Sequence, residues 1–437
     1  MKKIVFIFLV SFWSLTPAWA CAHAFGQKYT LPLPVWLYIF GGGAAVIASF
    51  LLIGYFATQP NPKGLEASIE LSRWKFFSFL IRPISSATFK LIGLILFIVT
   101  LGSGIFGSQI SSENFAPTFF WIIFLLGGTY LVALVGDVWR VVNPWKTIAL
   151  GLGDYKVFQY PKQIGYLPAL LVYFFIIWLE LLSGGAGVGP RNVTMYLLWY
   201  TAITIGGSSL FGNKDWFYYG DFFSVFFRLV GKLSPITYQE GKLKLRWPFV
   251  GLLDGSAERL SLLLFIIFML SSTAFDGFRE TVRAYKITVG LEFVKSYQSK
   301  QLIILLGVFL LFLAAYLAAI WLMKQIVKGN FSTKDLALIF AYSLIPIALA
   351  YNLAHYFTLF LSQGLNVGII GAKTVWQSQV MFILIGHIAA VYIAHIIALR
   401  IFGAPKQAIL SQLPMLAVMV CYTMIGLWIL SQPLIIG

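Results

Sequence analysis

Three of the four histidines in this chain lie within strongly apolar stretches near its C-terminal end. His355 follows the run SLIPIALAYNLA, and His387 and His395 share the run FILIGHIAAVYIAHIIALR. An imidazole can hold a metal ion, pass a proton or bind a substrate, and ionisable groups inside a membrane are costly and rare. Each of these histidines is therefore a candidate site residue whose partner has to be found.

Two carboxylates and the fourth histidine could complete a metal site around them. Glu180 in FFIIWLELLSGG and Asp276 in SSTAFDGFRE each lie near the end of an apolar stretch, and His23 comes just before the first one. Together with His355 and His387 they supply the nitrogen and oxygen ligands that bind Zn²⁺, Cu²⁺ or Fe²⁺. Two other interpretations stay open: hydrogen bonds from each histidine to a neighbouring helix, and a role in proton relay or substrate binding.

Helix geometry limits which histidines can act together. His387 and His395 are eight residues apart, or about 12 Å along a helix, so they cannot share one ion and His395 is predicted to be structural. If the two apolar stretches form an antiparallel pair, His355 and His387 differ in depth by about 9 Å, which helix tilt could remove. Asn352 and Tyr351 fall on the same helix face as His355. The sequence therefore predicts a shared site for His355 and His387 in the outer half of the membrane.

Two neighbouring residues favour an internal site at this place. Pro346 lies inside the apolar stretch of His355, where it is expected to kink the helix and free a carbonyl group one turn earlier. Gly386, beside His387, permits the close approach of another helix. Such breaks are tolerated in membranes where they face protein or a cavity.

The composition is that of a polytopic membrane protein. Apolar residues make up 59% of the 437 positions and charged residues 11%, and the mean hydropathy is +0.86. A soluble domain has roughly 25% charged residues. The formal charge is +16, but the basic residues lie in short loops between apolar runs, which argues against binding of nucleic acid.

Apolar windows of about 19 to 25 residues, each long enough to cross a bilayer as a helix, recur along the whole chain. They predict an all-α bundle of about ten transmembrane helices at 34–57, 88–108, 117–138, 166–184, 193–211, 257–275, 302–324, 336–360, 376–402 and 413–434. No soluble domain is expected between them.

The N-terminus reads as a secretory signal peptide over residues 1–22, followed by a single integral membrane domain over 23–437. Lys2 and Lys3 precede a short apolar run, and alternating alanines then offer three overlapping A-x-A cleavage sites. Cleavage after Ala22 would make His23 the first residue of the mature chain. The loops after the first, third and seventh windows are rich in Lys and Arg, which predicts that they face the cytoplasm. The protein is thus expected in a bacterial inner membrane, with both mature termini outward and the lipid bilayer as its environment.

The segment from Trp216 to Gly231 is ambiguous. It has Asp221 and Arg228 inside it, and it is short for a membrane span but aromatic enough for an interfacial or re-entrant helix. If it crossed, the basic loop after it and every later loop would change sides. The charge bias of the loops therefore favours a segment that does not cross.

A second polar group ends the third window at GDVWRVVNPWKT. Asp137 and Arg140 are three residues apart and can pair at the membrane interface, with Trp139 and Trp145 as aromatic anchors. This group is predicted to be a structural cap.

Several of these stretches together resemble a bacterial membrane-protein family identified as fenitrothion hydrolase. The stretches that carry the resemblance are HAFGQKYTLPLPVWLY from His23, AFDG from Ala274, LIPIALAYNLAHYF from Leu344, GHIAAVYIAH from Gly386 and YTMIGLWILSQP from Tyr422. The resemblance spans nearly the whole chain and implies hydrolysis of an organophosphate triester, a small lipophilic substrate. It assigns no catalytic residues, and the chain has no nucleophile elbow, P-loop or dinucleotide motif.

Two classes of function follow. The first is a membrane-embedded, metal-dependent hydrolase of organophosphate triesters, in which a bound metal activates water and stabilises charge on the phosphoryl oxygen. The second is a transporter or metal-handling permease, in which the same histidines bind a passing ion or relay protons.

Overall fold

The computed structural model describes residues 33–62, 64–65, 67–185, 187–327, 331–368 and 371–432. The predicted signal peptide (1–22) and His23 lie outside these residues. The described chain is mostly helical, with three short strands.

Eight helices in the described residues are long and apolar enough to cross a membrane. Three of them come early in the chain: α2 (Val35–Phe56), α4 (Pro83–Phe106), and the continuous helix α5 (Phe115–Pro117), η3 (Thr118–Gly127) and α6 (Gly128–Val135). Of the other five, the first two are α13 (Leu260–Arg279) and α15 (Tyr297–Val327). The next is one continuous helix made of α16 (Thr333–Phe340), η7 (Ala341–Leu344), α17 (Ile345–Leu359) and η8 (Phe360–Gly364). The last two are α18 (Ala372–Phe402) and α19 (Pro405–Ser431).

The two remaining predicted windows are helical but do not belong to these eight. The window 166–184 forms α9 (Leu167–Ile177) and a wider π-helical turn, η4 (Trp178–Leu182), which together are shorter than a standard span. The window 193–211 lies in α10 (Pro190–Phe211), which has 22 residues but carries many polar and small side chains. Eight of the ten predicted spans are thus supported by length and composition.

Short elements connect these helices. The short helices are α3 (Lys75–Leu80), α7 (Trp139–Val142), α8 (Pro144–Leu152), α11 (Asn213–Asp215), α12 (Phe222–Gly231) and α14 (Val282–Gly290), with single turns at η1 (Leu71–Arg73), η2 (Ser111–Glu113), η5 (Trp216–Gly220) and η6 (Val250–Leu253). The strands are β1 (Ile69–Glu70), β2 (Ile236–Gln239) and β3 (Lys242–Leu245).

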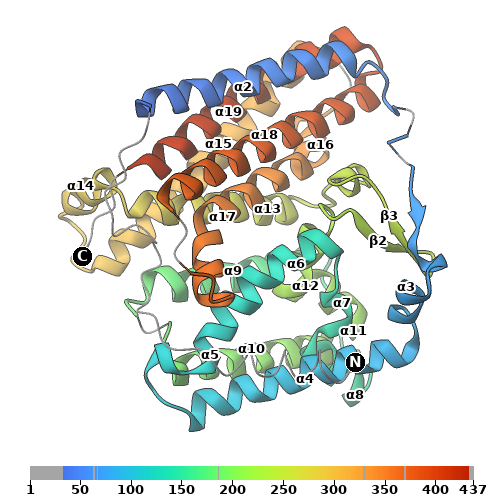
Figure 1. The fold of residues 1–437 in the computed structure, drawn as a ribbon, viewed down its shortest axis with the longest axis vertical. Coiled ribbons are helices and arrows are strands. Elements are labelled where there is room, and N and C mark those ends of the chain that lie inside the picture. Colours follow the sequence, from blue (N-terminus) through green and yellow to red (C-terminus); the bar gives the residue numbers. More distant parts are fainter. Residues whose placement is uncertain are drawn as a thin grey trace.

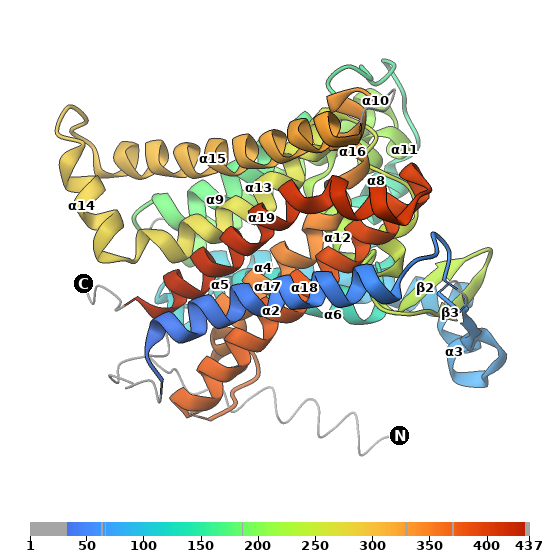
Figure 2. The ribbon, with the colours of Figure 1, turned by 90° about the horizontal axis from the view of Figure 1, so that it is seen from above.

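The long helices give the molecule two ends. Figures 1 and 2 both place α3 and the strands at one end, and α14 with the start of α2 and the end of α19 at the other. We call these the sheet end and the α14 end. The sides of the bundle between them expose large apolar side chains, among them Leu51, Phe56, Ile98 and Leu311. Such a surface suits contact with lipid hydrocarbon.

The sheet joins two loops that are far apart in the sequence. Its strand order is β1-β3-β2, and both pairs are antiparallel. Ile69 of β1 lies opposite Leu245 of β3, and Lys242 of β3 forms an ion pair of 3.1 Å with Glu70. The loop after α2 and the loop before α13 therefore lie at the same end of the molecule.

The ambiguous segment 216–231 enters the bundle and returns to the end at which it started. At the end of α10, Phe211 forms a β-bridge with Lys156. The chain then runs back along α10 until Asp221 accepts hydrogen bonds from Tyr200 and, at 3.5 Å, Thr204. From there α12 leads back to the sheet, where Ser234 donates to the carbonyl group of Leu134 at 3.0 Å. The segment is re-entrant, as the loop charges favoured.

Asp221 makes this break in the backbone tolerable. Its carboxylate accepts a hydrogen bond from the Ser224 amide at 2.9 Å and so caps the first turn of α12. Backbone groups at membrane depth need such internal partners because lipid offers none. The apolar side chains of α12, including Phe222, Phe223 and Phe227, are buried by the surrounding helices.

The helix α13 lies at the centre of the bundle. Nearly every side chain from Ser261 to Gly277 is buried, and α13 packs against α15, α17 and α9. A helix that is apolar and buried on all sides cannot face lipid or water. Any charged group on it must therefore find its partner inside the protein.

The close approach expected at Gly386 is present, whereas the carbonyl group one turn before Pro346, that of Tyr342, is not free because it accepts from the Ile345 amide. Pro346 is at the start of α17, directly after the tighter turn η7, so the helix changes character at that residue. A Cβ atom on Gly386 would lie only 2.2 Å from the Cβ atom of Ala350 and 2.9 Å from the Pro346 carbonyl oxygen. Helices α17 and α18 therefore meet here at a distance that only glycine allows.

Candidate functional site

Asp276 is the centre of a buried polar network near the α14 end. Its side chain is 6% exposed. One carboxylate oxygen lies 2.9 Å from Nε2 of His355 and also accepts a hydrogen bond from the Tyr356 hydroxyl, and the other accepts from Nε of Arg279 at 2.9 Å. Since a carboxylate oxygen accepts, His355 donates through Nε2. This carboxylate thus holds three side chains from two helices.

The network follows from the position of Asp276 on α13. Asp276 and Arg279 are three residues apart and therefore lie on one face of the helix. Arg279 also pairs with Glu280 at 3.2 Å and donates to the carbonyl group of Leu181, the residue after Glu180. The structure therefore places the predicted residues Asp276 and His355 in direct contact, with Glu180 on the adjoining turn η4.

Two buried oxygen atoms beside this network have no hydrogen-bond partner among the described residues. They are the hydroxyl oxygen of Tyr351 and Oδ1 of Asn352, on the turn of α17 before His355. The Tyr351 hydroxyl would lie 3.1 Å from a Cβ atom on Gly277, the residue that follows Asp276 in the chain. Tyr351 is therefore close to the network. A buried polar group without a partner costs about 1 to 3 kcal/mol. The site therefore offers a free hydrogen-bonding group to a small polar atom.

His387 does not share the network of His355. Its Nδ1 lies 2.8 Å from the carbonyl oxygen of Ile383, so Nδ1 donates and Nε2 is left as an acceptor. That Nε2 is buried and has no partner in the described part of the chain. The contact of Gly386 with Ala350 fixes the register of the two helices, which leaves His387 about 9 Å deeper than His355. The depth difference that helix tilt could have removed is therefore still present.

His395 is a structural residue with two partners. Nε2 lies 2.9 Å from the carbonyl oxygen of Ala57, and Nδ1 lies 3.0 Å from Nε2 of Gln412. The carbonyl group can only accept and the amide nitrogen can only donate, so the imidazole is neutral with its proton on Nε2. His395 thereby joins the end of α2 to α18 and α19, and it is fully buried.

The predicted metal ligands are only partly brought together. Within the described ranges no group of three or more His, Cys, Asp or Glu side chains could hold a metal ion. Among the predicted ligands that the structure describes, Asp276 and His355 are in contact, whereas a zinc site takes three or four protein ligands. The remaining predicted ligand, His23, lies outside the described residues, so the metal site stays a prediction.

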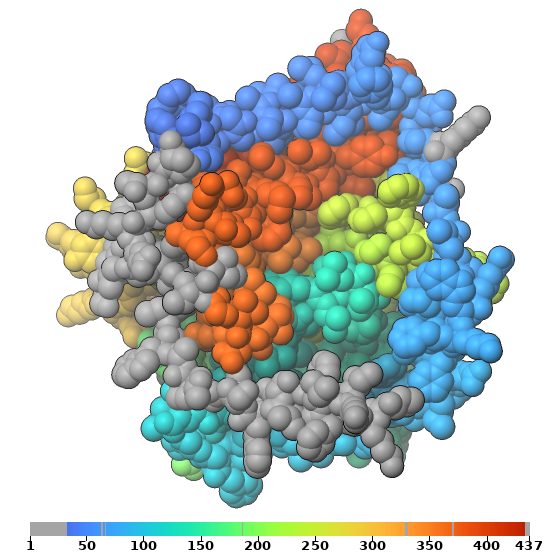
Figure 3. Space-filling view, viewed as in Figure 1, coloured from blue at the N-terminus to red at the C-terminus, as the bar shows by residue number. Residues whose placement is uncertain are grey.

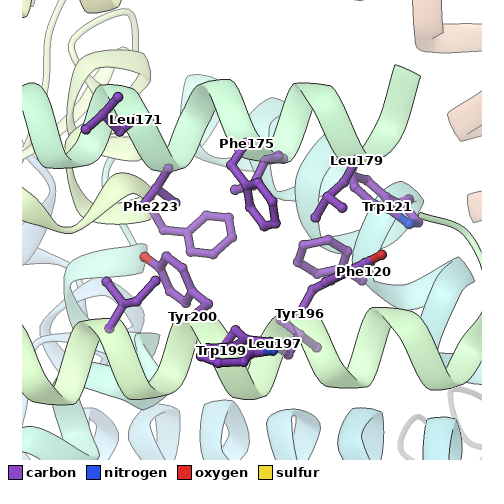
Figure 4. Close-up of a pocket in the computed structure, with 13 residues that line it drawn as sticks. Phe120, Trp121, Leu171, Phe175, Leu179, Tyr196, Leu197, Trp199, Tyr200 and Phe223 are labelled. Carbon is purple, nitrogen blue, oxygen red and sulfur yellow. The ribbon is translucent and has the colours of Figure 1, made fainter. Parts of the chain in front are cut away.

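An apolar pocket of about 250 Å³ lies between α9, α10 and η3. Figure 4 shows the rings of Phe120, Phe175, Tyr200 and Phe223 directed into it from different elements. The Tyr200 hydroxyl is bonded to Asp221, so the pocket is adjacent to the break before α12. Its lining can receive an apolar group but offers no charged side chain.

The group at Asp137 has the structural role that the sequence predicts, but through a different contact. The carboxylate of Asp137 accepts from the backbone amide of Arg140 at 3.3 Å, while the Arg140 guanidinium lies 5.0 Å from the ring centre of Tyr238. The carboxylate thus caps α7 and does not pair with the Arg140 side chain.

Sequence reasoning missed Arg279 and Tyr356 as members of the network. The spacing of Arg279 from Asp276 was a usable signal, because residues three apart on a helix can pair. Tyr356 gave no such signal, since it neighbours His355 in the chain and would be expected on a different face.

The arrangement defines a class of protein, a multi-pass membrane helix bundle with ionisable groups buried between its helices. No protein-family model, no curated protein and no solved structure matches the chain.

Proposed function

We propose that this membrane protein hydrolyses lipophilic phosphotriesters at the Asp276–His355 pair. The observation that carries the proposal is the convergence of the stretches behind the family resemblance. AFDG supplies Asp276 and Gly277, LIPIALAYNLAHYF supplies Tyr351 and His355, and Gly426 of YTMIGLWILSQP would meet the Tyr351 ring at 3.0 Å through a Cβ atom. Segments up to about 150 residues apart in the sequence thus meet around Tyr351 and the Asp276–His355 pair.

The residues there can supply the chemistry of triester hydrolysis. Asp276 orients the His355 imidazole, and a histidine held by a carboxylate is a common general base. The water oxygen bonds to phosphorus, its proton passes to the His355–Asp276 pair, and the bond to the leaving aryloxide breaks. The unpartnered Tyr351 hydroxyl donates to the phosphoryl oxygen, on which charge builds up. A metal held by His355, Asp276 and further ligands would add a Lewis acid at the same place.

A chromogenic aryl phosphotriester tests the proposal with full-length protein in detergent. We expect release of the phenolate by the wild type, a drop of at least about 100-fold in His355→Gln, and a drop of roughly 10-fold in Tyr351→Phe. The matched control is Tyr130→Phe, which removes another buried hydroxyl without a partner but outside the network. Absence of turnover in folded wild type, or full activity in His355→Gln, would refute the hydrolase.

A transporter is the second candidate, and the re-entrant α12 favours it. Discontinuous helices that end inside the membrane are common at the substrate sites of transporters. Sealed vesicles separate the two functions, because a permease moves Zn²⁺ across the membrane whereas a hydrolase turns over substrate in detergent. Metal analysis of the wild type beside His355→Ala/His387→Ala tests the metal in either case; equal metal content, or none, contradicts a role for these two histidines as ligands.

For the orientation, we propose that the sheet end faces the cytoplasm of a bacterium. The short elements at this end carry basic residues. Examples are Lys75 on α3, Arg140 on α7, Lys146 on α8 and Lys242 on β3. By the positive-inside rule both mature termini then face outward.

Reporter fusions test this orientation. We expect alkaline phosphatase fused after Ser431 to be active, because it folds only outside the cytoplasm, and the same enzyme fused after Gly403, between α18 and α19, to be inactive. The reverse pattern would place the sheet end outside.

A further inference from the structure

A polar cavity of about 490 Å³ lies at the sheet end, opposite the Asp276 network. It is bordered by the end of α12, the β2–β3 hairpin and the loop before α13. Figure 1 shows the hairpin beside α6, and Figure 3 shows the two in contact on one face of the molecule. Seven charged residues line it: Asp137, Arg140, Arg228, Lys232, Arg246, Asp254 and Glu258. Leu262 also lines it and lies on α13 about 21 Å from Asp276, so the two sites are separate.

The carboxylates in this cavity are already engaged. Asp254 pairs with Arg246 at 2.9 Å. Glu258 accepts hydrogen bonds from the hydroxyl groups of Tyr218 and, at 3.3 Å, Tyr166. Burial raises the pKa of Asp137, and the nearby charges of Arg228 and Arg140 act in the opposite direction. The lining therefore sets three carboxylates against four cationic side chains, which leaves one positive charge in excess.

Two guanidinium groups form no direct ion pair among the described residues, although both act on Asp137 from a longer distance. Neither Arg140 nor Arg228 lies within 4 Å of a carboxylate oxygen in the described ranges. Arg228 lies 4.2 Å from the ring centre of Tyr218 and donates one hydrogen bond, of 2.7 Å, to the carbonyl group of that residue. Arg140 lies over the ring of Tyr238. Stacking on a ring orients a guanidinium while leaving N–H groups at its edge for a ligand.

Lys232 adds a third cation. Its amine donates to the carbonyl oxygen of Asp254 at 2.9 Å and lies 4.8 Å from the ring centre of Tyr342. The amine is bonded to neutral carbonyl groups, so its charge is not cancelled by an ion pair. The cavity therefore combines a positive field with aromatic walls.

We propose that this cavity binds a phosphate-bearing anion through the guanidinium groups of Arg140 and Arg228. Guanidinium groups match the oxygens of phosphate in geometry and charge, and they bind it more strongly than neutral donors do. A volume of about 490 Å³ lies within the range of small-ligand pockets. The phosphate belongs either to a soluble metabolite or to the headgroup of an anionic lipid, since the cavity is at the membrane boundary.

Ligand-induced thermal stabilisation of the full-length protein tests the proposal, in a detergent that carries no phosphate. The two probes are inorganic pyrophosphate and short-chain phosphatidylglycerol, each titrated separately. We expect at least one to raise the melting temperature of the wild type in a saturable way. In Arg140→Gln/Arg228→Gln its apparent affinity should fall by at least roughly tenfold, because charge-assisted hydrogen bonds are lost.

The control variant is Lys242→Gln/Lys244→Gln, which removes the same charge from strand β3 outside the cavity lining and should bind as the wild type does. The single variant Arg140→Gln, which changes an exposed side chain, gives the readout if the double variant does not fold. A response to pyrophosphate assigns a soluble ligand, and a response to the lipid alone assigns a headgroup. The proposal is wrong if neither probe binds, if the Arg variants bind normally, or if the control loses binding equally.

Discussion

Replacing Asp276 by alanine should destabilise the protein by about 3 to 5 kcal/mol, which is the usual cost of removing one partner from a buried ion pair. The carboxylate accepts hydrogen bonds from His355, Tyr356 and Arg279. Without it, the hydrogen bonds that His355 Nε2 and the Tyr356 hydroxyl donate to Asp276 are lost, and Arg279 keeps its ion pair with Glu280. Unfolding of the purified protein in mixed detergent micelles measures the loss.

Two further variants separate this effect from a general effect of charge removal. Asp254→Ala breaks an ion pair whose carboxylate is 54% exposed, and such pairs contribute at most about 1 kcal/mol. Asp276→Leu/His355→Leu removes the carboxylate together with one of its three partners, and should recover part of the stability because apolar side chains replace these two residues. A loss for Asp276→Ala no larger than that for Asp254→Ala would mean that the network does not stabilise the bundle.

Substituting alanine for Gly386 should separate α17 from α18. The new Cβ atom would lie 2.2 Å from the Cβ atom of Ala350, whereas carbon atoms pack at about 3.5 to 4.0 Å. The helices must move apart, at a cost of about 1 to 3 kcal/mol. The movement would also shift Tyr351 and His387, which lie beside the contact, so hydrolysis should fall with stability. Both are measured on the same purified variant.

The chain provides a matched control and a rescue for this variant. Gly307 in α15 has no atom within 4 Å of its Cβ position, so Gly307→Ala should be neutral or slightly stabilising. The double variant Gly386→Ala/Ala350→Gly removes the contact with the Ala350 Cβ atom and should regain part of the loss, while the contact of 2.9 Å with the Pro346 carbonyl oxygen remains. If Gly386→Ala is as stable as Gly307→Ala, the close approach of α17 and α18 at Gly386 is wrong.

Much of the fold could be predicted because hydrophobic length is a strong signal. Eight of the ten windows are helices long and apolar enough to cross a membrane, and their boundaries agree to within a few residues at most ends. The signal weakens where helices pack on protein instead of lipid. The helix α9 with η4 is short, and α10 carries Thr194, Thr204 and Ser208, which are buried against neighbouring helices. Hydropathy alone cannot place such segments.

The site was only partly predictable because its contacts depend on register. Helical rise correctly separated His395 from His387, and Asp276 was among the predicted partners of His355. The sequence could not show that His355 turns toward α13 while His387 stays about one and a half turns deeper, since that follows from the contact of Gly386 with Ala350. For the same reason Tyr356 entered the network without a sequence signal.

The sheet also sets an order for biosynthesis. Strand β3 is held next to η1 by a hydrogen bond from the Leu243 amide to Ser72, two residues that are 171 positions apart. At about 5 to 20 residues per second, a ribosome needs roughly 10 to 30 s to make the chain between them. During that time the nascent chain must insert α4, α5 to α6, α9, α10 and the re-entrant α12 before the strands can meet. The sheet can thus form only after the chain has been made as far as β3. Until then β1, in the loop after α2, has no partner strand.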